Sequence, residues 1–174
     1  MGSKRKPTDP GSLSHVPADG SARMVDVGAK KVTRRSAVAE AWVEVGGEIA
    51  DAIRTAGSVA KGSVLETARL AGILAAKRTA ELIPLCHPIP LDAIAVDAEL
   101  QGDRVRILVR VSSEARTGVE MEALTAAAVA SLTVYDMVKS AAKGVSIGPI
   151  RLLEKHGGRS GSWSREEKKE EESG

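Results

Sequence analysis

The sequence predicts an α+β fold in which a mainly antiparallel sheet carries its helices on one face. Segments of alternating polarity, typical of strands, are interspersed with segments whose apolar residues recur every three or four positions, as in helices. Two strand-like segments are joined by a short turn, which favours antiparallel pairing. The core must consist of Ala, Val, Leu and Ile, because aromatic residues make up 2% of the chain and Phe is absent.

The folded body is predicted to begin near residue 24. Residues 32–45 alternate in polarity, which predicts a strand with one buried face that ends at Gly46 and Gly47. Residues 48–56 form a short predicted helix closed by Gly57. A second helix is expected from Ser63, which forms a capping box with Glu66, to about residue 82. Its predicted inner face comprises Val64, Ala68, Ala71 and Ala75.

Residues 82–91, LIPLCHPIPL, contain three prolines, so this segment is neither a helix interior nor a central strand. We expect it to be extended and stiff, with Cys86 and His87 presented in its middle. A metal site is not expected here, because His15 and His156 are the remaining histidines of the chain. Core packing is the simplest role for Cys86.

Residues 93–100 and 104–113 are two predicted strands joined by a Gln-Gly-Asp-Arg turn, and residues 145–153 are a last strand with Pro149 at an edge or bulge. A long helix is expected over residues 117–143. Its predicted packing stripe comprises Leu124, Ala127, Ala128, Ser131, Leu132, Tyr135 and Val138. The order of elements predicts a ferredoxin-like sheet with helices packed on one face.

Both ends of the long predicted helix carry ionisable residues. Glu120 and Glu122 lie in its first turn, and Asp136, Lys139 and Lys143 share a face near its end. These charges complement the helix dipole, and an Asp–Lys pair at this spacing is commonly a surface ion pair. At 1.5 Å per residue, Glu122 and Asp136 are separated by about 21 Å along the helix axis, which is too far for both to serve one small pocket in a single subunit. Either one end is structural, or two copies bring opposite ends together.

Composition limits the remaining possibilities. A chain of 174 residues suits one domain with tails, predicted as a disordered arm over 1–22, a catalytic domain over 23–157 and a flexible charged tail over 158–174. The net charge of +2 and the scarcity of aromatic residues argue against nucleic acid as a partner. A single Cys, no signal peptide and no apolar run of about 20 residues predict a cytoplasmic protein without a membrane span.

Cations near glycines and helix ends favour a phosphate-handling acid/base site. They are Lys61, Arg69, Lys77, Arg78, Lys139, Lys143 and Lys155. Lys61 precedes a helix cap, where it is either an ordinary flanking residue or an anion contact. Asp136 offers a base beside Lys139, and a lysine near other cations or partly desolvated has a lowered pKa.

Several strings of this sequence resemble the MoaC family of cyclic pyranopterin monophosphate synthases. They are MVDVGAK, LAGILAAKRT, LIPLCHPIPL, TGVEMEALTAAAVASLTVYDMVK and IGPIRLLEKHGGRSG. The resemblance covers roughly residues 24–161. It implies a ferredoxin-like subunit in a homohexamer, a trimer of dimers with active sites at the dimer interface. The implied reaction converts 3′,8-cyclo-7,8-dihydro-GTP to cyclic pyranopterin monophosphate with release of pyrophosphate, in molybdenum cofactor biosynthesis.

The resemblance also implies roles for individual residues. The catalytic residues that it implies are Lys61, Lys139 and Asp136. The implied substrate contacts are Leu85, Cys86, His87, Glu120, Met121 and Glu122, with Arg34, Lys77, Arg78 and Lys155 as phosphate or purine contacts. No cofactor or protein-bound metal is implied, and a Mg²⁺ ion accompanying the triphosphate is left open. The alternatives are a non-catalytic nucleotide-binding module and a basic RNA-binding domain.

Overall fold

The computed structural model describes residues 21–56, 62–159 and 161–165. Its elements are β1 (Thr33–Glu44), α1 (Gly47–Ala56), α2 (Val64–Lys77), α3 (Thr79–Leu82), β2 (Ala93–Gln101), β3 (Arg104–Ala115), α4 (Glu120–Val138), β4 (Ser146–His156) and β5 (Trp163–Ser164). The predictions for Gly57 and Lys61, for most of the N-terminal arm and for the end of the tail fall outside the described residues.

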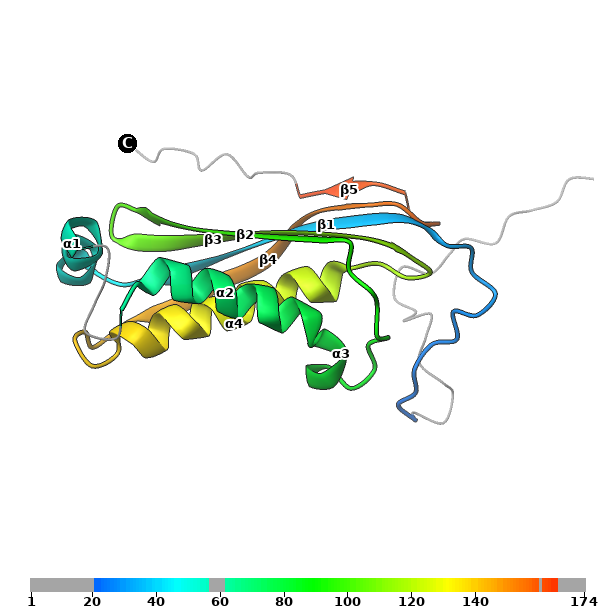
Figure 1. Ribbon diagram of the computed structural model, residues 1–174, viewed down its shortest axis with the longest axis horizontal. Helices are drawn as coiled ribbons and strands as arrows, with labels where there is room; N and C mark the ends of the chain where they lie inside the picture. The colour runs from blue at the N-terminus through cyan, green and yellow to red at the C-terminus, as the bar shows by residue number, and fades with distance from the viewer. Residues whose placement is uncertain (1–20, 57–61, 160, 166–174) are drawn as a thin grey trace, which may run out of the picture.

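The sheet has the strand order β2-β3-β1-β4-β5, with every neighbouring pair antiparallel. Helices α2 and α4 lie side by side on one face of this sheet, and α1 lies at one end of it (Figure 1). The first four strands and the two long helices follow the ferredoxin-like arrangement. The predicted fold class is confirmed.

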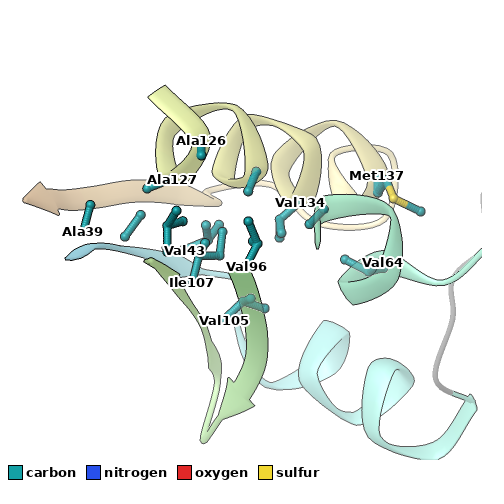
Figure 2. Close-up of a cluster of buried hydrophobic side chains, with 14 of the residues drawn as sticks. Ala39, Val43, Val64, Val96, Val105, Ile107, Ala126, Ala127, Val134 and Met137 are labelled. Atoms are coloured by element: carbon teal, nitrogen blue, oxygen red, sulfur yellow. The ribbon is translucent and has the colours of Figure 1, made fainter. Parts of the chain in front are cut away.

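The core lies between the sheet and the two long helices. Alternate residues of β1 from Ala37 to Val43 are buried on the helix side, as the polarity pattern predicts. Figure 2 shows side chains of β1, β3 and α4 facing one another across this space. Helix α2 approaches α4 closely at Gly72, where an added Cβ would lie 3.2 Å from the carbonyl oxygen of Ala126. Small residues therefore set the spacing of the helical layer.

The opposite face of the sheet is charged around a buried carboxylate. Glu40 of β1 is 3% exposed and accepts hydrogen bonds from Arg106 at 3.0 Å and from Arg151 at 2.7 Å. Burial raises the pKa of the Glu40 carboxyl, but hydrogen bonds and charge from Arg151 and Arg106 outweigh burial and hold that pKa below its ordinary value. Glu40 thus ties β1 to both of its neighbouring strands.

The second predicted helix is divided in two. Helix α2 ends at Lys77, and α3 begins at Thr79 instead of continuing the same helix to residue 82. The Arg78 N–H donates to the carbonyl of Ala75 at 3.0 Å, which tightens the last turn of α2. The Thr79 hydroxyl donates to carbonyls of the same turn, and this competition with the backbone favours a break.

Helix α4 is shorter than predicted, and the face it presents to the core overlaps the predicted stripe only in part. It runs from Glu120 to Val138, so Lys139 is its C-cap and Lys143 lies beyond it. Leu132 is 59% exposed and Tyr135 40% exposed, although both were predicted on the packing stripe. The helix is apolar around most of its circumference, so periodicity does not identify which side is buried. Ala127, Ser131 and Val138 of the predicted stripe are buried as expected, and Ala126, Ala130 and Val134 occupy the core beside them.

Three local features also differ from expectation or refine it. The Cys86 N–H donates to the carbonyl of Ile83 at 3.1 Å, so the proline-rich segment contains a turn and is not extended throughout. Trp163 of β5 pairs with Lys155 of β4, and β5 is an element that the sequence analysis did not predict. Pro149 lies beside a register shift opposite residues 41–43, as expected for a proline at a bulge.

Helix α4 is long and apolar enough to pass a test for membrane spans based on length and composition. More than half of this apolar stretch of α4 is buried within the fold, and α4 packs on the sheet and on α2. Helix α4 therefore serves as the core helix of this domain.

Candidate active site

Two adjoining hollows lie where the proline-rich loop after α3 passes the start of α4. The first hollow has a volume of about 440 Å³, and the second has a volume of about 340 Å³. Six predicted substrate contacts line the first hollow, namely Leu85, Cys86, His87, Glu120, Met121 and Glu122. Lys77 and Arg78 line the second hollow, and His87, Ile89 and Glu122 border both. Eight predicted contacts from two distant segments of sequence are thus brought together.

The start of α4 is shaped to present its carboxylates. Glu120 and Glu122 lie in the first turn, where unpaired backbone N–H groups favour negative charge. A Cβ on Gly118 would come within 1.8 Å of the Glu120 carboxylate, so the absence of a side chain leaves room for that group. The Glu120 carboxylate pairs with Lys155 of β4 at 3.2 Å, and both side chains are about one-third exposed. This pair connects the hollow to the sheet.

Glu122 differs from Glu120 in its surroundings. It is 3% exposed, and its Oε2 atom has no hydrogen-bond partner in the described part of the chain. Burial raises the pKa of the Glu122 carboxyl, and the charge of Glu120 raises it further, although a hydrogen bond with its own backbone opposes this. Burial also raises the pKa of the Cys86 thiol, with a smaller contribution from Glu122. Cys86 is therefore poised as a thiol and not as a thiolate nucleophile.

The other end of α4 carries the second part of the predicted site. Lys139 Nζ lies 2.7 Å from the Asp136 carboxylate, and both side chains are more than half exposed. The hydrogen bond to Asp136 and its charge raise the pKa of Lys139, which is opposite to the expected lowering. At 1.5 Å per residue, Asp136 lies about 21 Å along α4 from Glu122, and Lys139 lies about 25 Å from it. A single subunit therefore does not unite Lys139 with the hollows, and Lys61 lies outside the described residues.

Arg34 and its neighbour Arg35 lie on opposite faces of β1, and the role predicted for Arg34 stays a prediction. Strand alternation puts Arg35 on the helix side of the sheet with Ala37, and directs Arg34 away from the first hollow. Arg35 Nη2 donates to the carbonyl of Arg116 at 3.5 Å, and its Nε atom is buried without a partner among the described residues. Strand parity in the sequence was the signal that could have selected Arg35.

The sequence analysis also missed one wall of the first hollow. Arg23, Val25, Val27 and Lys30 line it, and they belong to the segment before β1. The string MVDVGAK contributed to the family resemblance without receiving a role. Among the described residues, no three His, Cys, Asp or Glu side chains are grouped in a way that could hold a metal ion.

The fold and these hollows indicate a class of protein: an α+β enzyme that acts on a small polar molecule. A recess with cations, carboxylates and a histidine suits such a ligand better than an extended nucleic-acid surface.

The comparison with known proteins makes this class specific. The MoaC family model matches residues 24–158, and the chain belongs to the MoaC family. A relative from Novosphingobium aromaticivorans is 52% identical over 155 residues, which cover 89% of this chain and 98% of the relative. One from Thermomicrobium roseum is 55% identical over 157 residues, covering 89% and 94%. Another from Corynebacterium efficiens is 54% identical, covering 87% and 97%. All three are named cyclic pyranopterin monophosphate synthase.

Proposed function

We propose that this chain is a cyclic pyranopterin monophosphate synthase, a lyase of molybdenum cofactor biosynthesis. It converts 3′,8-cyclo-7,8-dihydro-GTP to cyclic pyranopterin monophosphate and releases pyrophosphate. The observation that carries this conclusion is that relatives with this name match the chain over more than nine-tenths of their own length. The two hollows, which gather the predicted ligand contacts of the loop and of α4, agree with a small-molecule substrate.

We assign the acid/base steps to Lys139 and Lys61, with Asp136 orienting Lys139. The 2.7 Å contact between Lys139 and Asp136 supports this positioning role. Cations around the hollows hold the triphosphate and stabilise the pyrophosphate as it leaves, since fixed positive charge favours a developing anion. Residues of the loop and the start of α4, including His87 and Glu122, contact the ring system.

A second subunit brings Lys139 to the hollow. The separation of about 21 Å along α4 supports a shared site, since one small recess cannot span that length. Exposed apolar side chains on the helical layer also support subunit packing, because monomers rarely leave such side chains together in water. They include Leu70 and Leu74 of α2 and Leu132 and Tyr135 of α4. The proposed assembly is a homohexamer, a trimer of dimers with sites at the dimer interface.

The proposed reaction uses no resident cofactor, and any Mg²⁺ enters with the triphosphate. Assays of chelator-treated protein with and without added Mg²⁺ test this point. The proposed location is the cytoplasm, where a GTP-derived substrate is made.

Turnover with the purified full-length chain tests the function directly. We expect incubation with 3′,8-cyclo-7,8-dihydro-GTP to yield pyrophosphate and cyclic pyranopterin monophosphate in equal amounts. The Lys139→Ala variant should lose about 10²-fold or more in rate without a change in thermal unfolding, because a proton-transfer group is removed from an exposed position. Lys143→Ala is the matched control, since Lys143 lies beyond α4. Tight binding without pyrophosphate release would instead indicate a non-catalytic nucleotide-binding module.

A further inference from the structure

The segment before β1 supplies a wall of the first hollow, and none of its residues was assigned a role. Arg23, Val25 and Val27 line the hollow in alternation, as residues on extended backbone do when one side faces a surface. Lys30 lines the same hollow after a reversal of the chain. Two cations and two apolar side chains therefore face the loop and the start of α4.

Local hydrogen bonds hold the reversal that returns Lys30 to the hollow. The Gly28 N–H donates to the Asp26 carboxylate at 2.7 Å, and the Lys30 N–H donates to the carbonyl of Val27 at 3.0 Å. A Cβ on Gly28 would lie 3.1 Å from the same carboxylate oxygen, so a small residue suits this turn. The string MVDVGAK thus encodes a turn that positions a lysine.

Charge is distributed unevenly across the first hollow. The helix wall presents the carboxyl groups of Glu120 and Glu122, and Lys155 already neutralises Glu120. The opposite wall presents Arg23 and Lys30, which form no ion pair with any other described residue. The side chains of these two residues are exposed and so accessible to a ligand. A molecule with an anionic tail and a polar ring therefore binds in one orientation.

We propose that Arg23 and Lys30 are phosphate-binding residues of the substrate site, and that the triphosphate lies against the segment before β1 while the ring lies against the loop and α4. This inference rests on the proposed function for the identity of the substrate, and extends it by assigning residues and an orientation. Lys77 and Arg78 line the second hollow, beyond the His87 and Glu122 boundary, and are the competing phosphate site.

Two probes test the two ends of the substrate separately. Inorganic tripolyphosphate lacks the ring, and guanosine lacks phosphate. Calorimetric titration of the full-length Arg23→Ala/Lys30→Ala variant should show at least about tenfold weaker tripolyphosphate binding, since two charge-assisted contacts are lost. Guanosine affinity should stay within about twofold of the wild-type value, because the ring end is untouched. The Lys30→Arg variant, which keeps the positive charge, should retain most of the wild-type affinity for tripolyphosphate.

Lys31→Ala is the matched control, because Lys31 is the exposed neighbour of Lys30 and lines neither hollow. Equal losses in Lys30→Ala and Lys31→Ala would overturn the proposal, as would loss of tripolyphosphate binding in Lys77→Ala/Arg78→Ala alone. Because these titrations need no turnover, a chain that binds tripolyphosphate through Arg23 and Lys30 but makes no product would refute the synthase function and leave this inference standing.

Discussion

Glu120 and Glu122 are two residues apart in the first turn of α4, yet their carboxyl groups lie in different environments. Glu120 is partly exposed and paired with Lys155, whereas Glu122 is 3% exposed with an unpartnered oxygen. Such divergence between neighbouring acids is a common way to obtain distinct protonation states within one site. The first turn of α4 thus presents one carboxylate paired with a lysine and one buried carboxyl group whose pKa is raised.

The raised pKa of Glu122 makes its effect on stability depend on pH. The folded state binds this proton more tightly than the unfolded state, so its contribution is full below the unfolded pKa and is lost as pH rises through the folded pKa. Glu122→Gln should therefore stabilise the fold by about 1 kcal/mol at pH 8, where the wild type must bury a charge or take up a proton. Urea unfolding at pH 8 and pH 4 checks this, and the gain should shrink at pH 4. Equal destabilisation at both pH values would contradict the assignment.

Glu40 should show the opposite dependence. Its folded pKa is lowered by Arg151 and Arg106 in spite of burial, so its contribution is present above the unfolded pKa and is lost as pH falls through the folded pKa. Glu40→Gln should lower the free energy of unfolding by about 2 kcal/mol at pH 7, because two arginines lose a buried partner. The difference from wild type should vanish in acid.

Glu44→Gln is the control for Glu40→Gln. Glu44 lies on the same face of β1, and its contact with Arg104 at 3.7 Å is exposed on both sides. The change should cost less than about 0.5 kcal/mol at pH 7. A comparable loss in both variants would mean that the buried network contributes nothing beyond surface charge.

At the scale of elements, the contact between α2 and α4 depends on a residue without a side chain. Gly72→Ala should gain about 1 kcal/mol of helix propensity, but its Cβ would meet the Ala126 carbonyl at 3.2 Å and the Ala130 Cβ at 3.3 Å. Because the backbone of α4 cannot shift far in a packed core to relieve this clash, we expect net destabilisation of about 1 kcal/mol. Gly47→Ala in α1 is the control, because its Cβ would meet open space. Thermal unfolding of both variants checks this, and a stabilised Gly72→Ala would show that the helices can move apart.

The helix boundaries were predictable where a local signal exists. Ser63 caps α2, with its hydroxyl accepting from the Glu66 N–H, and Gly46 follows β1 as expected. The break at Arg78 and the end of α4 at Val138 were not predictable, because both sequences continue with residues that favour helix. At these places hydrogen bonds of the turns decide the outcome.

At the scale of the whole molecule, the shared-site proposal predicts complementation between inactive subunits. His87→Ala alters the hollow and Lys139→Ala alters the far end of α4, so a hybrid dimer retains one site with both residues intact. Hybrids co-expressed with two different tags and purified through both should regain up to about half of the wild-type rate. Each variant alone should remain inactive. Failure of doubly tagged hybrids to turn over substrate would place the complete site within one subunit.

The sequence by itself determined the order of the four long strands and of α1, α2 and α4, the small aliphatic core, and two of the segments whose side chains line the hollows. Polarity alternates strongly in β1, and residues such as Gly118 and the three prolines restrict the backbone locally, so these features can be recognised without long-range information. The family resemblance rested on those same segments.

Only the tertiary structure decided which residues of α4 are buried and that the segment before β1 forms a wall of the site. Nor does the chain by itself unite Lys139 with the hollows. The physical reason is that sequence periodicity predicts the buried side of a helix only where one side is polar and the other apolar. Helix α4 is apolar around most of its circumference. A wall formed by Arg23 and Lys30 depends on the return of a distant loop, and no local pattern specifies that return.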